Sequence, residues 1–175
     1  MACGMLFLNL LLPAVPILLF AGIAIAYFLG PRFYMSSLGA HETQDERLNG
    51  WIADYSKLMG IEKPALYVTE QASPVAFSAH GVKPRVCISR LVLERLSPEE
   101  VKAILIHEIA HIMMKTQIHK VFLSFLRFLT PFSLIHSFQG DLQPTESRAN
   151  GYVKAIQGTS AFVDSAADKV TEFYS

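Results

Sequence analysis

The sequence of 175 residues contains few cysteines and carries no net charge, and both features exclude classes of protein. Its two cysteines, Cys3 and Cys87, lie far apart and show neither a metal-binding nor a redox spacing. A disulfide framework is therefore not expected, which favours a reducing compartment. The formal net charge of +0 and the absence of a basic stripe argue against nucleic acid as a partner.

Charged residues are also absent from a long stretch near the amino terminus. Residues 5–29 are apolar except for Asn9, which is long enough for a helix that crosses a bilayer. No Lys or Arg precedes this stretch, which argues against a secretory signal peptide. Because Arg32 follows it closely, the positive-inside rule places the remainder of the chain in the cytoplasm. We therefore predict a single-pass membrane protein, with a transmembrane anchor at 1–31 and a folded domain at 32–175.

The pattern with the clearest chemistry is His-Glu-x-x-His at residues 107–111. On an α-helix His107 and His111 lie on the same face, so their imidazoles can bind one metal ion. Glu108 projects beside that ion, where it can act as a general base toward water. The alternative is a buried helix with two unrelated histidines, which would cost several kcal/mol for unpartnered polar groups. The pattern thus predicts one Zn²⁺ per chain and a zinc metalloendopeptidase, a hydrolase with a protein or peptide substrate.

The segment that precedes this motif contains a helix start. Ser97 is a predicted N-cap, Pro98 occupies the first helical position, and Glu100 completes a capping box. Residues 101–114 are then almost entirely apolar apart from Lys102 and the motif. We therefore expect the motif helix to be buried on most sides, with the metal site inside a core.

The other elements indicate an α+β fold with a small β-sheet. Helical periodicity covers 43–59 and ends at Gly60, and short helices are expected at 91–96 and 161–173. The last of these is expected to close the domain without contributing chemistry. Strand-like runs cover 65–69, 75–79 and 85–89, and a turn separates the last two. The middle run can be an open edge that binds an extended substrate or an ordinary core strand; it comprises Val75, Ala76, Phe77, Ser78 and Ala79.

The order of these elements, the segment 73–81 and the run from Leu91 to His111 resemble the HtpX and CAAX prenyl endopeptidase family. Its members are membrane-embedded, zincin-like zinc metallopeptidases of the gluzincin type. A metzincin is excluded, because Met114 and Gln117 stand where that class has Gly and a third His. The resemblance implies that Glu146 is the third zinc ligand and that the substrates are membrane or membrane-associated proteins, in quality control. The small residues Ala149 and Gly151 would let its helix approach the motif helix closely.

One residue departs from the family pattern. Asn150 stands where the family has an Asp that orients a zinc-binding histidine, so we expect weaker zinc binding or slower turnover. This departure keeps a catalytically weak or inactive zinc-binding membrane scaffold open as an alternative. A signalling protease with a single partner substrate is the other alternative. Three residues are candidate donors to the oxyanion of the reaction: Tyr152, His80 and His136.

The segment between the two groups of predicted ligands is rich in Phe and Leu. If it crossed the membrane once, Glu146 would lie on the opposite side of the bilayer from His107 and His111. Arg127 and Pro131 also disfavour a span. We therefore expect 118–138 to contain an interfacial or re-entrant segment in contact with membrane lipid, and packing within the core is the alternative.

Overall fold

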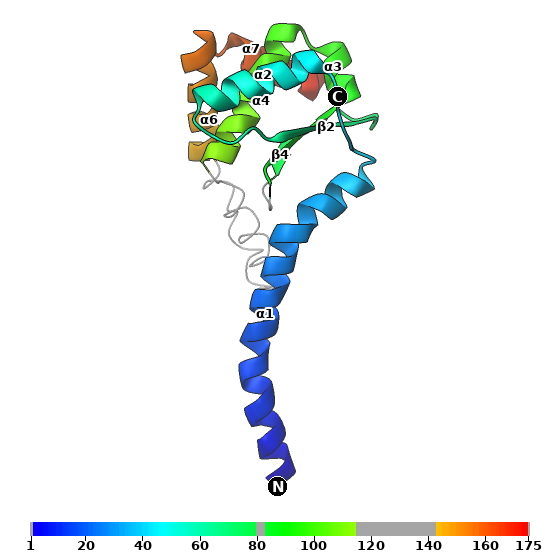
Figure 1. Ribbon diagram of the computed structural model, residues 1–175, viewed down its shortest axis with the longest axis vertical. Coiled ribbons are helices and arrows are strands. Elements are labelled where there is room, and N and C mark those ends of the chain that lie inside the picture. The colour runs from blue at the N-terminus through cyan, green and yellow to red at the C-terminus, as the bar shows by residue number, and fades with distance from the viewer. Residues whose placement is uncertain (1, 80–82, 115–142, 175) are drawn as a thin grey trace.

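The computed structural model describes residues 2–79, 83–114 and 143–174. A long helix, α1 (Ala2–Ser37), extends away from a domain of helices and strands (Figure 1). The domain contains β1 (His41–Glu42), β2 (Ala65–Thr69), β3 (Ala76–Ala79) and β4 (Arg85–Ser89), with helices α2 (Glu46–Leu58), α3 (Arg90–Arg95), α4 (Pro98–Met113), α6 (Gln143–Gln157) and α7 (Ala161–Glu172). The expected α+β architecture with a small sheet is therefore present.

The four strands of the described residues form one mixed sheet in the order β1-β2-β4-β3. β2 and β4 are parallel, whereas β3 runs antiparallel to β4 and β1 antiparallel to β2. Both central strands coincide with the runs predicted from the sequence. β3 begins at Ala76, one residue later than predicted, although Val75 still bonds to Ser89 through its backbone. Within this sheet β3 is therefore an edge strand.

Helix α4 is the central element of the domain. Ser97 accepts a hydrogen bond from the backbone N–H of Glu100, and the Glu100 carboxylate accepts one from the backbone N–H of Ser97. The predicted capping box is thus confirmed. Leu105 and Ile109 of α4 are fully buried against α2 and the sheet, while Ala103 and Ile106 pack toward α6 and α7. The motif helix is buried on most sides, as its apolar sequence predicts.

Helix α6 approaches α4 through small and branched residues. Ala149 and Val153 have no exposed surface, and Val153 packs with Ala103 and Ile106 of α4. Gly151 contributes nothing to this approach, because it is exposed and a Cβ built there would meet no atom within 4 Å. The expectation that both small residues face α4 is therefore wrong for Gly151, which lies outside the face that repeats through Ala149 and Val153.

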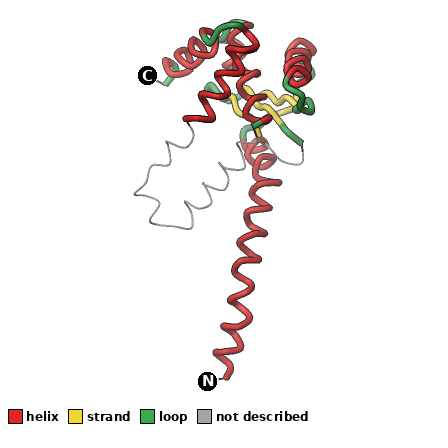
Figure 2. Tube along the Cα trace, turned by 90° about the vertical axis from the view of Figure 1, so that its left-hand side faces the viewer, coloured by secondary structure: helices red, strands yellow, loops and turns green. Residues whose placement is uncertain are grey.

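The carboxyl end of α1 packs against the side of the sheet away from α4. Met35 is buried with Ala79 and Cys87, and the Tyr34 ring lies 5.2 Å from the ring of Phe77 between centroids. The rest of α1 runs away from the domain (Figure 2). Within the described part of the chain, no helix combines the length and the apolar character needed to cross a membrane.

Glu100 links the start of α4 to α7. Its side chain is only 5% exposed, and it accepts hydrogen bonds from Ser165 at 2.7 Å and from Lys169 at 2.7 and 2.8 Å. Burial opposes ionisation, but these bonds and those from Ser97 outweigh it and lower the pKa of Glu100 to about 2. The carboxylate therefore holds α7 against α4 in its ionised form.

Replacing Glu100 by glutamine is expected to lower the free energy of unfolding by about 2 kcal/mol at pH 7, because charge-assisted bonds are lost. Folding lowers this pKa from 4.5 to about 2. The wild type should therefore exceed the variant in free energy of unfolding by the full amount above pH 4.5, and this difference should shrink as the pH falls toward 2. Denaturant unfolding of the full chain in detergent measures it. The matched Glu99→Gln change removes only an exposed pair with Lys102 and should cost less than about 1 kcal/mol. Equal losses in both variants would contradict this role.

Candidate metal centre

Two histidines are presented by one face of α4. His107 and His111 lie one turn apart, and their rings meet edge to face at a centroid distance of 4.6 Å. Their side chains are 16% and 5% exposed, respectively. The apolar sequence of α4 buries this face, so both imidazoles are held in a defined position and largely shielded from water.

Glu146, in the first turn of α6, completes a triangle of ligand atoms. Its Oε2 lies 3.2 Å from Nε2 of His107 and 3.2 Å from Nε2 of His111, and the two Nε2 atoms are 3.0 Å apart. A tetrahedral zinc ion with bonds of about 2.0–2.1 Å holds its ligand atoms roughly 3.3 Å apart. Among the residues that the structure describes, these three are the group able to hold a metal ion. Two nitrogens and one carboxylate oxygen at this spacing fit zinc and leave a fourth position open.

Asn150 orients His107 from one turn further along α6. Its Oδ1 lies 2.8 Å from Nδ1 of His107. Because a carbonyl oxygen can only accept, Nδ1 of His107 carries the proton and donates a hydrogen bond to Oδ1 of Asn150. Nε2 of the neutral ring then presents its lone pair toward Glu146 and His111. The contact with His107 that is expected at this position is therefore made by a neutral amide, without a negative charge.

The electrostatics of the site favour a cation. Burial lowers the pKa of His107, but the hydrogen bond that the protonated ring donates to Glu146, the nearby Glu108 carboxylate and Asn150 together raise it above its usual value. A neighbourhood that stabilises a protonated imidazole also stabilises a metal ion bound between these groups.

Glu108 lies beside the ligand triangle rather than in it. Glu108 is buried, with 9% of the residue exposed, and it lines a pocket of about 320 Å³ together with His107, Glu146 and Asn150. A carboxylate at the wall of such a pocket can exchange a proton with a molecule inside it. The position agrees with the one that the sequence motif predicts for a general base.

The structure brings some of the other predicted residues to this site and leaves others away from it. Ala76 of the edge strand lines the pocket, whereas Tyr152 is 37% exposed on α6 and does not line it. His80, His136 and the segment 118–138 lie outside the described residues. The residues from 75 to 79 also border a second hollow of about 560 Å³ between β3 and α1, which includes Tyr34.

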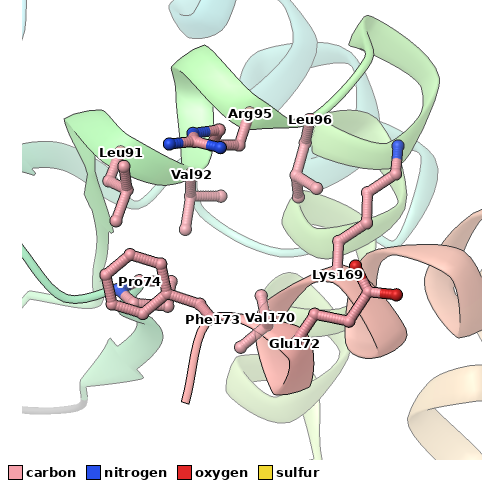
Figure 3. Close-up of a pocket in the computed structure, with 9 residues that line it drawn as sticks. All are labelled: Pro74, Leu91, Val92, Arg95, Leu96, Lys169, Val170, Glu172 and Phe173. Carbon is pink, nitrogen blue, oxygen red and sulfur yellow. The ribbon is translucent and has the colours of Figure 1, made fainter. Parts of the chain in front are cut away.

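Helix α7, from which no chemistry is expected, lines the pocket as well. Its residues Val163, Asp164, Ala166, Ala167 and Val170 form one wall. Apolar residues recur three and four positions apart along α7, and this spacing predicts that one face of the helix is packed. The spacing does not indicate which cavity that face borders. Beyond Val170, a hollow of about 470 Å³ separates α3 from α7, with Leu91 and Val92 facing Phe173 (Figure 3). No metal-site residue lines that hollow, so the smaller pocket is the one beside the chemistry.

Three features together define the zincin-like class of metallopeptidase folds. They are an α+β domain with a small sheet, His-Glu-x-x-His on a buried helix, and a glutamate from a later helix. Within that class, the chain belongs to peptidase family M48, whose sequence pattern matches residues 42–171. This confirms the resemblance that the motifs and the order of elements indicate.

Individual relatives support the same assignment. The chain is 34% identical over 98 residues to a protease HtpX homolog of Methanothermobacter thermautotrophicus, covering 53% of this chain and 38% of the relative. It is 30% identical over 97 residues to plastoglobule-localized metallopeptidase 48 of Arabidopsis thaliana, covering 54% and 27%. The crystal structure of S. mikatae Ste24p shares the fold with a TM-score of 0.55 at 21% identity, covering 69% of this chain and 30% of that one. The chain thus spans less than two fifths of the length of these relatives.

Proposed function

We propose that the chain is a membrane-anchored, zinc-dependent endopeptidase that cleaves membrane or membrane-associated proteins in quality control. The observation that carries the proposal is the triangle of His107, His111 and Glu146, with ligand atoms 3.0–3.2 Å apart and Glu108 at the wall of the adjoining pocket. Membership of family M48 and the relatives named as proteases support the same activity.

Each residue of the site has a role in this reaction. When bound, zinc supplies a Lewis acid that polarises the scissile carbonyl and lowers the pKa of water to about 7. His107, His111 and Glu146 hold it, and Asn150 fixes the ring of His107. Glu108 accepts a proton from the attacking water and passes it to the leaving amine. The buried surroundings of Glu108 limit competing contact with bulk water.

The edge strand supplies a binding surface for an extended substrate. Among the strands that the structure describes, β3 pairs with β4 alone, and the hollow of about 560 Å³ lies between β3 and α1. A peptide in this hollow can pair with the backbone of residues 75–79 as an added strand. Ala76 borders both this hollow and the metal-site pocket, so the bound backbone would pass close to Glu108.

The apolar amino-terminal segment within 1–31 is proposed, on the basis of its sequence, as the single membrane anchor. Its support is the apolar sequence of 5–29 and the exposure of apolar side chains on α1, such as Ile17, Leu18 and Phe20 at 68%, 70% and 70%. The positive-inside rule favours a cytoplasmic location for the domain at 32–175. Co-flotation of the full chain with phosphatidylcholine vesicles, compared with residues 32–175, tests the anchor; equal flotation of both chains would refute it.

The alternative of a weak or inactive zinc-binding scaffold is favoured by Asn150 alone, because this position lacks the charge of the family pattern. Intact Glu108 argues against it, since a structural zinc site needs no general base. A signalling protease with one partner substrate shares the same site and differs only in the range of proteins cleaved.

Asn150→Asp is expected to bind zinc about tenfold more tightly, because a carboxylate makes the His107 ring a more basic ligand. Asn150→Ala should bind about tenfold more weakly, since the ring loses its bond at 2.8 Å. Competition with a chromophoric chelator measures both affinities. If the aspartate and the alanine leave zinc affinity unchanged, the bond to His107 has no part in metal binding.

Cleavage of casein by the detergent-purified, zinc-loaded full chain tests the proposed function. We expect cleavage that stops when phenanthroline removes the metal and returns when Zn²⁺ is added. An absence of cleavage with zinc bound would instead support the scaffold or the protease with a single partner. Cleavage that persists without metal would contradict the zinc mechanism.

A further inference from the structure

The pocket beside the metal site has an apolar wall that reaches well beyond the ligands. Besides Ala76 of β3, it is bordered by Ile104 of α4 and by apolar residues along α7. These residues are small or branched: Val163, Ala166, Ala167 and Val170. Its volume of about 320 Å³ lies at the lower end of the range for ligand-binding pockets, so it can accept one long side chain.

A single charged residue of α7 stands at this otherwise apolar wall. Asp164 lines the pocket and is exposed. It makes no ion pair with another residue of the described chain, and Lys169 on the same helix is instead bound to Glu100 at 2.7 and 2.8 Å. A first-turn acid also suits the helix dipole, but that preference does not require it to face the pocket.

Among the described residues that border the pocket, Asp164 is the carboxylate whose charge neither an ion pair nor the predicted metal offsets. Glu108 and Glu146 are the other two carboxylates that border it, and both lie at the metal end beside His107. A divalent ion on the predicted ligands offsets those two negative charges. The negative charge of Asp164 then remains in the otherwise apolar wall that α7 forms, where a cation would be its natural complement.

We propose that this pocket receives an arginine or lysine side chain of the substrate next to the cleaved bond, a proposal that rests on the proposed peptidase function. The aliphatic stem of such a side chain packs along Ile104, Val163 and Ala167, and its charged end reaches Asp164. Long basic side chains bury their methylene groups on apolar surface while the charged group stays near water. Asp164 is thereby a specificity-determining residue and takes no part in the chemistry.

Peptide binding tests the pocket without requiring cleavage. Zinc-loaded Glu108→Gln full chain in detergent is titrated with short dye-labelled Ala/Gly/Ser peptides that differ only in a central Arg, Leu or Glu. Fluorescence anisotropy gives each affinity. We expect the Arg peptide to bind about fivefold more tightly than the Leu peptide, the upper range for an exposed ion pair, and the Glu peptide more weakly than both. In the Asp164→Asn background the preference for Arg should fall to about equality.

A matched control lies one turn away on the same helix. Asp168 is exposed like Asp164 but does not border the pocket, so Asp168→Asn should keep the preference for Arg. Tighter binding of the Leu peptide, an equal loss of preference in both variants, or no binding of any peptide would each overturn the proposal. Mass spectrometry of peptides cleaved by the wild type should also show Arg or Lys beside the cut bond. If peptides bind in an Asp164-dependent way but none is cleaved, the proposed peptidase function is refuted, whereas the proposed binding of a basic side chain in the pocket is supported.

Discussion

Changing Glu108 to glutamine is expected to lower the turnover of peptide cleavage by about a hundredfold to ten thousandfold, the usual contribution of a general base. Glu108 borders the pocket beside His107, and the three predicted ligands do not include it. Glutamine keeps the size of the side chain but cannot accept a proton from water at neutral pH. Zinc content should therefore stay at one ion per chain while catalysis is lost.

The measurement compares casein cleavage and bound zinc for the wild type and the Glu108→Gln full chain. Glu99→Gln is the matched control, because Glu99 lies on the same helix but pairs with Lys102 at the surface. It should retain wild-type turnover. Equal cleavage by the wild type and Glu108→Gln would indicate a contaminating protease and remove the support for this mechanism. Loss of zinc together with activity would instead make Glu108 a part of the metal-binding shell.

The parts of the fold that could be predicted depend on short-range signals. Ser97 and Glu100 are three residues apart, so the start of α4 is determined by side chains that contact the backbone nearby. The central strands were also predictable, because each is a compact apolar run with clear ends. β1 was not predictable: its two residues form a strand only because they pair with Val68 and Tyr67.

The residues of the candidate site likewise fall into those that the local sequence predicts and those that depend on tertiary packing. His107, Glu108 and His111 fall within five residues, and helical geometry alone brings the two imidazoles together. Glu146 is 35 residues from His111, so only the family resemblance indicated it. Asp164 lies on a helix with no recognisable motif, and its place at the pocket depends on how α7 packs against α4. That packing is partly determined by the bond from Lys169 to Glu100.

Replacing Glu146 by glutamine is expected to weaken zinc binding by more than about a hundredfold. The charged ligand becomes a neutral amide, and changes one shell further out already cost tenfold to a hundredfold. The loss also appears as stability. With free zinc at a hundred times the wild-type Kd, the metal stabilises the folded wild type by about 2.7 kcal/mol, but a hundredfold weaker variant by only about 0.4 kcal/mol. Chelator competition and unfolding with and without zinc therefore report the same change.

The Glu146→Gln variant distinguishes two roles for Glu146. It is either a metal ligand or a surface carboxylate that pairs with Arg148 or contacts solvent. Arg148→Gln is the matched control, because Arg148 is exposed on the same helix two residues away. A ligand role requires that Glu146→Gln loses zinc affinity and zinc-dependent stability while Arg148→Gln keeps both. If Glu146 instead formed a surface ion pair with Arg148, losing that pair would lower the free energy of unfolding by less than about 1 kcal/mol in either variant, whether or not zinc is present. An effect of Glu146→Gln that does not depend on zinc would thus exclude it as the third ligand, although its Oε2 lies 3.2 Å from both histidine nitrogens.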